Sequence, residues 1–320
     1  MNTPIRLARH RLDDSARDLL GKEIHSRVHE GVLDSDTDEA ILSGIGATAL
    51  RRLLPGELLD SLGKFAATDS HALIIENLPT QEFPPTPVTG FGSEADLAEV
   101  NALHFGLLQL LELTPYAVDY ENEGRLIRNV VPNPEASGTT SSWGADSDFF
   151  WHTDNPHLRF GEPGLDPRPY VPRYLTFYAV RNEEQVPTEL VALEDTLARL
   201  DPALLQELQR PQFRLGAPAS NDVDPRHGPL AIDGVPLLEI GRSGRYQVRY
   251  DRGTVCGAGP GSNQVVETWA AALEEVPSNE FALGPGDFLI FDNYRVLHRR
   301  RAFVPAPAEQ ARWLRRCYAS

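Results

Sequence analysis

The stretch FFWHTDNPH, residues 149–157, contains the side chains best suited to metal chemistry. His152 and Asp154 are two positions apart, and side chains at i and i+2 of a β-strand point to the same face. A strand here would therefore present an imidazole and a carboxylate together. Nine histidines and 46 acidic residues among 320 predict about one such pair by chance, so its interpretation depends on residues elsewhere in the chain.

A third ligand is available in GPGDFLIFDNYRVLHRR, residues 284–300. The run DFLIFDN is typical of a strand, and a turn and a second short strand then lead to His298. Two histidines and one carboxylate with open positions form the facial triad of non-haem Fe(II) oxygenases. Two alternatives use the same residues: a hydrolase that holds zinc to activate water, and a non-catalytic jelly-roll binding protein in which the triad is incidental.

The C-terminal stretch ARWLRRCYAS, residues 311–320, is rich in arginine. A strand here would place Arg312, Leu314 and Arg316 on one face and Arg315 on the other. The planar guanidinium binds carboxylates through two parallel hydrogen bonds, which suits an arginine beside a metal for a dicarboxylate co-substrate. The hydrolase alternative has no use for such a residue. The run from Arg299 to Arg301 is expected to be solvated surface.

The elements that must position these residues are mainly short strands. Residues 1–66 show helical leucine spacing, residues 71–79 (HALIIENLP) indicate a buried strand, and residues 94–113 indicate a helix. From Tyr116 onward short extended runs recur between turns, with helical insertions at 192–209 and 263–276. This pattern predicts an α+β, mainly β fold with a jelly-roll or barrel core and flanking helices. We expect one domain over 1–320, with a helical part at 1–70 packed on a core at 71–320.

The composition limits the partners of the chain. A net charge of −16 argues against nucleic acid, since such partners require a basic footprint, and favours a small-molecule substrate. Two cysteines without a CxxC motif fit a reducing cytoplasm. The N-terminus lacks the apolar run of a signal peptide, and no segment approaches the roughly 20 apolar residues of a membrane span. The oligomeric state is left open.

Three motifs, FFWHTD, GDFLIFDNYRVLHRR and ARWLRRCYAS, occur in an order that resembles the clavaminate synthase-like branch of the taurine dioxygenase (TauD) superfamily. The resemblance extends over about residues 70–320 and includes RLIRNVVPNP, SSWG and YLTFYAVRNEEQVPTELVAL. It implies an oxygenase that depends on Fe(II), 2-oxoglutarate and O2, built on a double-stranded β-helix, the cupin-like jelly roll. It further implies hydroxylation of an unactivated C–H bond in an amino acid or amino-acid-derived metabolite, with desaturation or cyclisation as alternatives.

The resemblance also implies roles for individual residues. His152, Asp154 and His298 fall on the three iron-ligand positions. Arg312, fourteen residues after His298, falls on the arginine that binds the distal carboxylate of 2-oxoglutarate, and Thr188 on the threonine that assists it. The remaining candidates are expected to contact substrate. Arg316 stands at the position that often binds the substrate carboxylate in this branch, and the others are Ser142, Asp251, His157 and Arg128.

Two positions depart from the pattern of this branch. Asp154 stands where its members more often carry glutamate, although aspartate is usual in the wider superfamily. A retained carboxylate there argues against a halogenase, which leaves the position free for chloride. Arg128 stands where free amino-acid hydroxylases of the branch often carry a glutamine that contacts the α-amino group. A cation repels an ammonium group, so Arg128 favours an acidic or amino-modified substrate.

Overall fold

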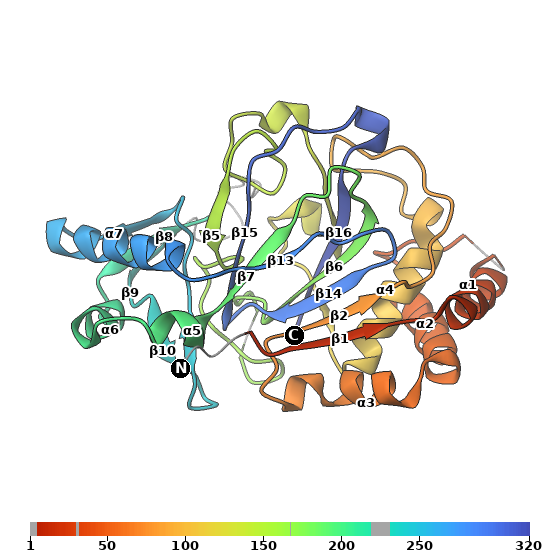
Figure 1. The fold of residues 1–320 in the computed structure, drawn as a ribbon, viewed down its shortest axis with the longest axis horizontal. Coiled ribbons are helices and arrows are strands. Elements are labelled where there is room, and N and C mark those ends of the chain that lie inside the picture. The colour runs from red at the N-terminus through yellow and green to blue at the C-terminus, as the bar shows by residue number, and fades with distance from the viewer. Residues whose placement is uncertain (1–4, 30–31, 167, 219–230) are drawn as a thin grey trace.

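The computed structural model describes residues 5–29, 32–166, 168–218 and 231–320. Two β-sheets face each other at the centre, a helical layer covers the outer face of the larger sheet, and a second group of helices and short strands covers the outer face of the smaller one (Figure 1). This arrangement confirms the predicted jelly-roll core with flanking helices. No helix in the described ranges is long and apolar enough to cross a membrane.

The larger sheet has seven strands, in the order β1-β2-β14-β6-β16-β3, with β4 also paired to β16. The strands are β1 (Leu7–Arg11), β2 (Ala72–Glu76), β3 (Pro115–Tyr116), β4 (Ile127–Val130), β6 (Tyr174–Arg181), β14 (Phe288–Asp292) and β16 (Trp313–Ala319). Successive side chains alternate between its two faces. In β14, Phe288 and Ile290 pack under the helical layer, whereas Leu289 and Phe291 pack between the two sheets. Because both faces are covered there, β2, β6 and β14 are almost continuously hydrophobic.

The smaller sheet carries the strands that concern chemistry, in the order β13-β7-β15-β5. They are β5 (Phe149–His152), β7 (Thr188–Ala192), β13 (Asn279–Phe281) and β15 (Val296–Arg300). Here too the side chains alternate: Val296 faces the inter-sheet core, while Leu297 faces the outer group of elements. His298 follows Val296 by two positions and therefore faces inward.

The helical layer consists of α1 (Asp14–Val28), α2 (Glu39–Leu53), α3 (Gly56–Lys64) and α4 (Ala98–Leu110). Helix α1 begins where the Asp13 side chain accepts a hydrogen bond from the Ala16 amide at 2.8 Å. Helices α2 and α4 cross in close contact, since a Cβ atom on Gly46 would lie 1.8 Å from the carbonyl oxygen of Ala102. Helix α4 is thereby held firmly between α2 and the large sheet.

The outer group consists of α5 (Leu193–Leu197), α6 (Pro202–Leu208), α7 (Pro260–Glu274), β8 (Phe213–Gly216), β9 (Ala231–Val235), β10 (Leu238–Ile240), β11 (Tyr246–Val248) and β12 (Val255–Gly257). The helical insertion predicted at 192–209 is two helices. The second begins at Pro202, where the Asp201 side chain caps the Ala203 amide at 2.7 Å.

One prediction for the N-terminal part is wrong. Residues 7–11 are not helical but form β1, which pairs in parallel with β2. The run LARHR has no apolar repeat of its own, and its extended form comes from the backbone hydrogen bonds that the exposed edge of β2 offers. The helical prediction holds for α1 and α3, and α2 lies between them.

Candidate active site

His152, Asp154 and His298 are brought together by the pairing of β5 with β15. His298 lies directly opposite His152 in that antiparallel pair, and their ring centroids are 4.0 Å apart. Asp154 follows the end of β5, and its Oδ1 atom lies 3.3 Å from His152 Nε2 and 3.4 Å from His298 Nε2. All three side chains are buried. Neighbouring ligands of a six-coordinate metal with bonds of about 2.1 Å are separated by about 3 Å, so the three atoms fit one metal ion.

Local contacts prepare both imidazoles to act as ligands. His152 Nδ1 lies 2.7 Å from the Phe150 carbonyl oxygen, which can only accept, so Nδ1 carries the proton and Nε2 carries the lone pair. That Nε2 atom has no hydrogen-bond partner among the described residues. Burial lowers the pKa of His298 to about 4, so this imidazole is neutral at pH 7.

Asp154 is oriented by groups on the opposite sheet. Its Oδ2 atom accepts hydrogen bonds from Arg316 Nη1 and from the Tyr318 hydroxyl, both at 2.9 Å, which leaves Oδ1 facing the histidines. Its backbone N–H donates to the Asn293 side-chain oxygen at 2.9 Å. Burial would raise the pKa of Asp154, but the charge of Arg316 is the main cause that holds it well below its usual range. The carboxylate therefore stays ionised.

The triad opens onto a pocket between the two sheets. The pocket is lined by Val130, Ser142, Phe149, Asp154, Phe177, Thr188, His298, Arg299, Arg300, Arg312, Leu314 and Arg316. The predicted face of Arg312, Leu314 and Arg316 is thus present, and Thr188 reaches it from β7. The Arg312 Nη2 atom lies 3.4 Å from Thr188 Oγ1.

Arg312 is a buried cation without a carboxylate partner in the part of the chain that the structure describes. Burial, reinforced by the nearby charge of Arg300, lowers its pKa to about 9. A buried guanidinium is costly unless an anion pairs with it, and its Nε atom has no partner in the described chain. The donor set therefore fits a dicarboxylate that reaches from the metal to Arg312.

The run Arg299 to Arg301, predicted to be solvated surface, is mostly buried, and that prediction is wrong. Strand β15 is central in its sheet, and its two faces are covered by the larger sheet and by the outer group of helices and strands. Arg299 lies on the outer face, bonded to Glu189 and over the Trp151 ring, and only Arg301 is exposed. Arg300, two positions after His298, faces the pocket and donates to the Ser141 and Ala145 carbonyls.

Arg300 is a site residue that the sequence analysis missed. It holds the segment 141–145 over the pocket and adds positive charge beside Arg312, which favours a dianion there. Burial lowers the pKa of Arg300 to about 10, so it remains charged at pH 7. The alternation of β15 could have identified it, since His298 and Arg300 are two positions apart.

Arg315 points away from the pocket, as the two-residue period predicts. It lies under the helical layer, where it is fully buried and bonded to Glu94, Asn101 and Asn129. Glu94 is in turn bonded to Ser35 and Asn101. This is a structural ion pair that joins β16 to the start of α4.

Replacing Glu94 with glutamine should destabilise the protein without weakening binding at the pocket. Loss of one partner leaves the Arg315 charge buried and uncompensated, which costs about 3–5 kcal/mol. Urea unfolding should show this as a lower midpoint with an unchanged slope. Glu135→Gln, on an exposed turn, is the matched control. A Glu94→Gln protein of normal stability would show that the pair is not the attachment point described here.

The candidate substrate residues Arg316 and Arg128 lie side by side. They are direct partners in the β16–β4 pairing, and like charges in such positions repel each other. Glu121 compensates: it is bonded to Arg316 and to the Tyr318 hydroxyl, and its Oε1 atom lies 3.5 Å from Arg128 Nη1. Burial would raise the pKa of Glu121, but the charges of Arg316 and Arg128 lower it overall. Glu121 was not found from the sequence, because no local pattern connects residue 121 to β16. Tyr318 was missed too, although it follows Arg316 by two positions in β16 and the strand period places it on the same face.

Arg128 itself does not line the metal pocket but lies behind Arg316. It is fully buried over the Trp143 ring, 4.2 Å from its centroid, and none of its three side-chain nitrogens has a hydrogen-bond partner in the described chain. Arg316, in contrast, is already bonded to Asp154 and Glu121.

The other three candidates occupy different places. Ser142 lines the pocket, and its buried hydroxyl has no partner in the described ranges. Asp251 forms an isolated backbone bridge with His152 and accepts from the Gly253 amide at 2.8 Å; burial raises its pKa. His157 does not line the pocket, and its Nε2 atom lies 3.1 Å from the Tyr120 hydroxyl. Their roles toward substrate stay predictions.

The double-sheet core with a buried His–Asp–His set and a buried arginine for a dicarboxylate is characteristic of the Fe(II)/2-oxoglutarate-dependent oxygenases. The comparison with protein families agrees: residues 86–318 match "Taurine catabolism dioxygenase TauD, TfdA family". The chain belongs to this family, and the resemblance stated from the sequence is confirmed. It is therefore an enzyme, an oxygenase that uses Fe(II) and 2-oxoglutarate.

The sequence identity between this chain and individual relatives is low. Enduracididine beta-hydroxylase of Streptomyces hygroscopicus is 24% identical over 82% of this chain and 81% of its own length. L-lysine 4-hydroxylase of Niastella koreensis is 24% identical over 79% of this chain and 68% of its own length.

Solved structures share the fold. An asparagine oxygenase in complex with Fe(II), 2S,3S-3-hydroxyasparagine and succinate superposes with a TM-score of 0.80, at 20% identity over 97% of this chain and 92% of the other. The non-haem iron oxygenase OrfP, in complex with Fe and alpha-ketoglutaric acid, superposes with a TM-score of 0.76, at 22% identity over 97% of this chain and 93% of the other.

Proposed function

We propose that His152, Asp154 and His298 hold the Fe(II) ion and that Arg312, with Thr188, binds the distal carboxylate of 2-oxoglutarate. The single observation that carries this proposal is the placement of a buried guanidinium, without a carboxylate partner among the described residues, in the same pocket as the buried triad. When bound, iron and 2-oxoglutarate supply the oxidising chemistry: O2 is consumed, 2-oxoglutarate becomes succinate and CO2, and one oxygen atom enters the substrate.

The residues of the chain contribute binding and orientation. The Phe150 carbonyl fixes the tautomer of His152, and Arg316 with Tyr318 turns Asp154 Oδ1 toward the histidines. Arg300 adds positive charge and holds the segment 141–145 over the co-substrate end of the pocket. Phe149, whose ring lies 3.8 Å from that of His152, forms an apolar wall that limits access of water.

The proposed substrate is an amino acid or an amino-acid-derived metabolite that carries a carboxylate near Arg316 and Arg128. Relatives whose names record amino-acid hydroxylation support the class of compound. The side-chain nitrogens of Arg128 have no hydrogen-bond partner in the described chain, and their one ion-pair partner there, Glu121, is shared with Arg316; this supports an acidic group on the substrate, since buried donors gain from an anion. A carboxylate that bound Arg316 would have to share it with Glu121.

Hydroxylation is the proposed outcome, and desaturation and cyclisation are alternatives because all three begin with removal of a hydrogen atom from the substrate. The zinc hydrolase and the non-catalytic binding protein are less well supported. Neither provides a reason to bury Arg312 beside the triad without a carboxylate partner in the described ranges.

The test is to add Fe(II) and 2-oxoglutarate anaerobically and to look for the weak visible charge-transfer band. Oxygen is then admitted with a panel of acidic, neutral and basic amino acids and their N-modified forms, and succinate and oxidised product are measured. The expected result is the band, followed by succinate formation that one substrate class stimulates. Zinc-dependent hydrolysis without 2-oxoglutarate, or absence of metal binding, would contradict the proposal.

Replacing Arg128 with glutamine should change the substrate preference while metal and 2-oxoglutarate affinities stay within about twofold. Arg128 lies behind Arg316 and does not line the pocket at the triad, so the substitution should affect only substrate binding. Removal of its charge should improve use of substrates with a free α-amino group relative to acidic ones by about tenfold, or 1.4 kcal/mol. The ratio of kcat/KM values for a matched pair of substrates measures this. An unchanged ratio would remove Arg128 from the substrate site.

A further inference from the structure

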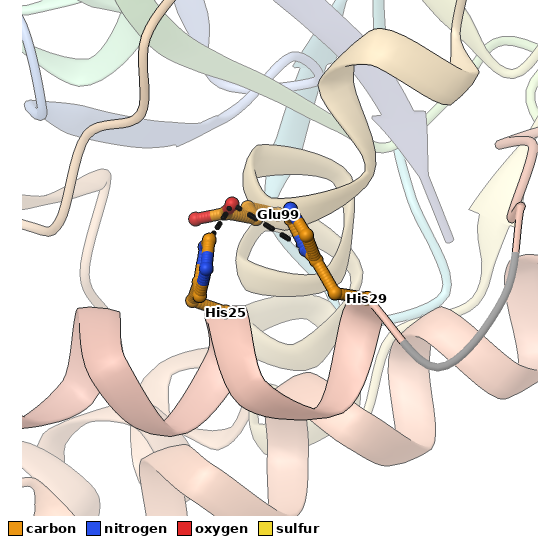
Figure 2. Close-up of side chains that lie close together, drawn as sticks. All are labelled: His25, His29 and Glu99. Carbon is orange, nitrogen blue, oxygen red and sulfur yellow. Dashed lines mark hydrogen bonds and ion pairs between the residues drawn. The ribbon is translucent and has the colours of Figure 1, made fainter.

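A second group of potential metal ligands lies in the helical layer, away from the two sheets that hold the triad. His25 is in the last two turns of α1, His29 caps the end of that helix, and Glu99 is in the first turn of α4. Figure 2 shows the two imidazoles side by side on α1 with the Glu99 carboxylate pointing at both. One ligand atom from each residue lies within 4.8 Å of the others.

The spacing along the chain produces this arrangement. Residues four apart on a helix lie on the same face, and a histidine pair at i and i+4 is a known way for a helix to bind zinc. The ring centroids of His25 and His29 are 4.0 Å apart. Glu99 then approaches from a different element, since α1 packs against α4. Because α4 is buried between α2 and the large sheet, it is a rigid support for the third ligand.

The Glu99 carboxylate is hydrogen-bonded to His25 and lies farther from His29. Glu99 Oε1 lies 2.8 Å from His25 Nδ1 and 3.9 Å from His29 Nδ1. The second distance is too long for a hydrogen bond. Ligand atoms of a tetrahedral zinc ion, with bonds of about 2.0 Å, are about 3.3 Å apart, which lies between the two observed values. Shifts of about half an ångström in exposed side chains would place all three atoms around one ion.

Glu99 has no other assigned partner. Within the described ranges its ion-pair partners are the two histidines alone, whereas Glu23, two residues before His25 on α1, is engaged by Arg27 and Arg52. The Glu99 side chain is 19% exposed and those of the histidines are 58% and 60% exposed, so water can complete the coordination.

We propose that His25, His29 and Glu99 form a surface site for a divalent transition-metal ion such as Zn²⁺, which accepts both nitrogen and oxygen ligands. Two imidazoles and one carboxylate exclude Ca²⁺ and Mg²⁺, which require oxygen ligands. The ion joins the end of α1 to the start of α4 and stabilises the folded protein, since the three ligands are together only in that state. The site is separate from the catalytic triad and takes no part in the oxidation.

The test is the zinc content of the full-length protein after removal of metal and dialysis against micromolar ZnCl2. Because the triad can also hold zinc, the measured quantity is the difference between wild type and His29→Ala, which we expect to be about one ion per chain. Glu99→Gln should lose the same ion, and His10→Ala, a histidine outside the cluster, should lose none. Added zinc should raise the Tm of wild type by a few degrees more than that of His29→Ala.

Repeating the zinc measurement on His298→Ala protein separates this proposal from the proposed iron site. The surface site should still bind one zinc ion when the triad cannot. Equal zinc content in wild type, His29→Ala and Glu99→Gln would overturn the proposal and leave the cluster as an ion pair. His29→Ala should bind 2-oxoglutarate as wild type does, which also shows that the variant is folded.

Discussion

Arg312→Ala should weaken 2-oxoglutarate binding by about 100-fold or more, or roughly 3 kcal/mol, while Fe(II) binding is kept. The guanidinium is buried, and its one side-chain hydrogen bond in the described chain joins Arg312 Nη2 to Thr188 Oγ1 at 3.4 Å. Its loss leaves the distal carboxylate of 2-oxoglutarate desolvated without a charged donor. Titration of the charge-transfer band with 2-oxoglutarate under anaerobic conditions measures the change directly.

Two further variants make this result specific. Thr188→Ala should have a smaller effect, about tenfold or less, because a hydroxyl contributes one neutral hydrogen bond. Arg301→Ala removes an exposed arginine that follows the end of β15 and should leave 2-oxoglutarate affinity unchanged. If Arg312→Ala bound 2-oxoglutarate normally, Arg300 would be the first residue to consider as the carboxylate anchor, because it is the other cation at that end of the pocket.

His298→Ala should abolish turnover, with a loss on the order of a thousandfold or more, because it removes one of three protein ligands and with it the Fe(II) ion. The imidazole is neutral at pH 7, with its pKa lowered to about 4 by burial, so no proton competes with the metal. Equilibrium dialysis should show loss of Fe(II), and the charge-transfer band should be absent at any 2-oxoglutarate concentration.

The control for this variant is His10→Ala, which alters a half-buried histidine of β1 outside the triad. It should keep wild-type iron content and activity. Circular dichroism should show that His298→Ala is folded, since the cavity it creates adjoins a pocket rather than the core. A folded His298→Ala protein that still bound Fe(II) and formed succinate would mean that the three residues do not share one metal ion.

Several features of this protein were determined by the sequence alone, because they depend on short-range geometry. The two-residue period of a strand places His152 near Asp154 and puts Arg312 and Arg316 on the face opposite to Arg315, and the structure has all of these. The same period would have placed Arg300 beside the co-substrate. Its neighbours in the sequence are also arginines, and a run of charged residues predicts exposed surface. The prediction fails because β15 is an interior strand of its sheet.

Other features were decided only by the tertiary structure. The direct opposition of His152 and His298 comes from the register of β5 with β15, and the turn of Asp154 toward them comes from Arg316 and Tyr318 on the other sheet. Arg128 meets Arg316 through the pairing of β4 with β16, Glu121 reaches both from the segment before β4, and β1 is a strand because β2 offers it an edge. Likewise, Glu99 meets His25 and His29 only because α4 packs against α1. Local periodicity fixes which way a side chain points, whereas its partner is set by packing between segments far apart in the chain, which no short-range pattern encodes.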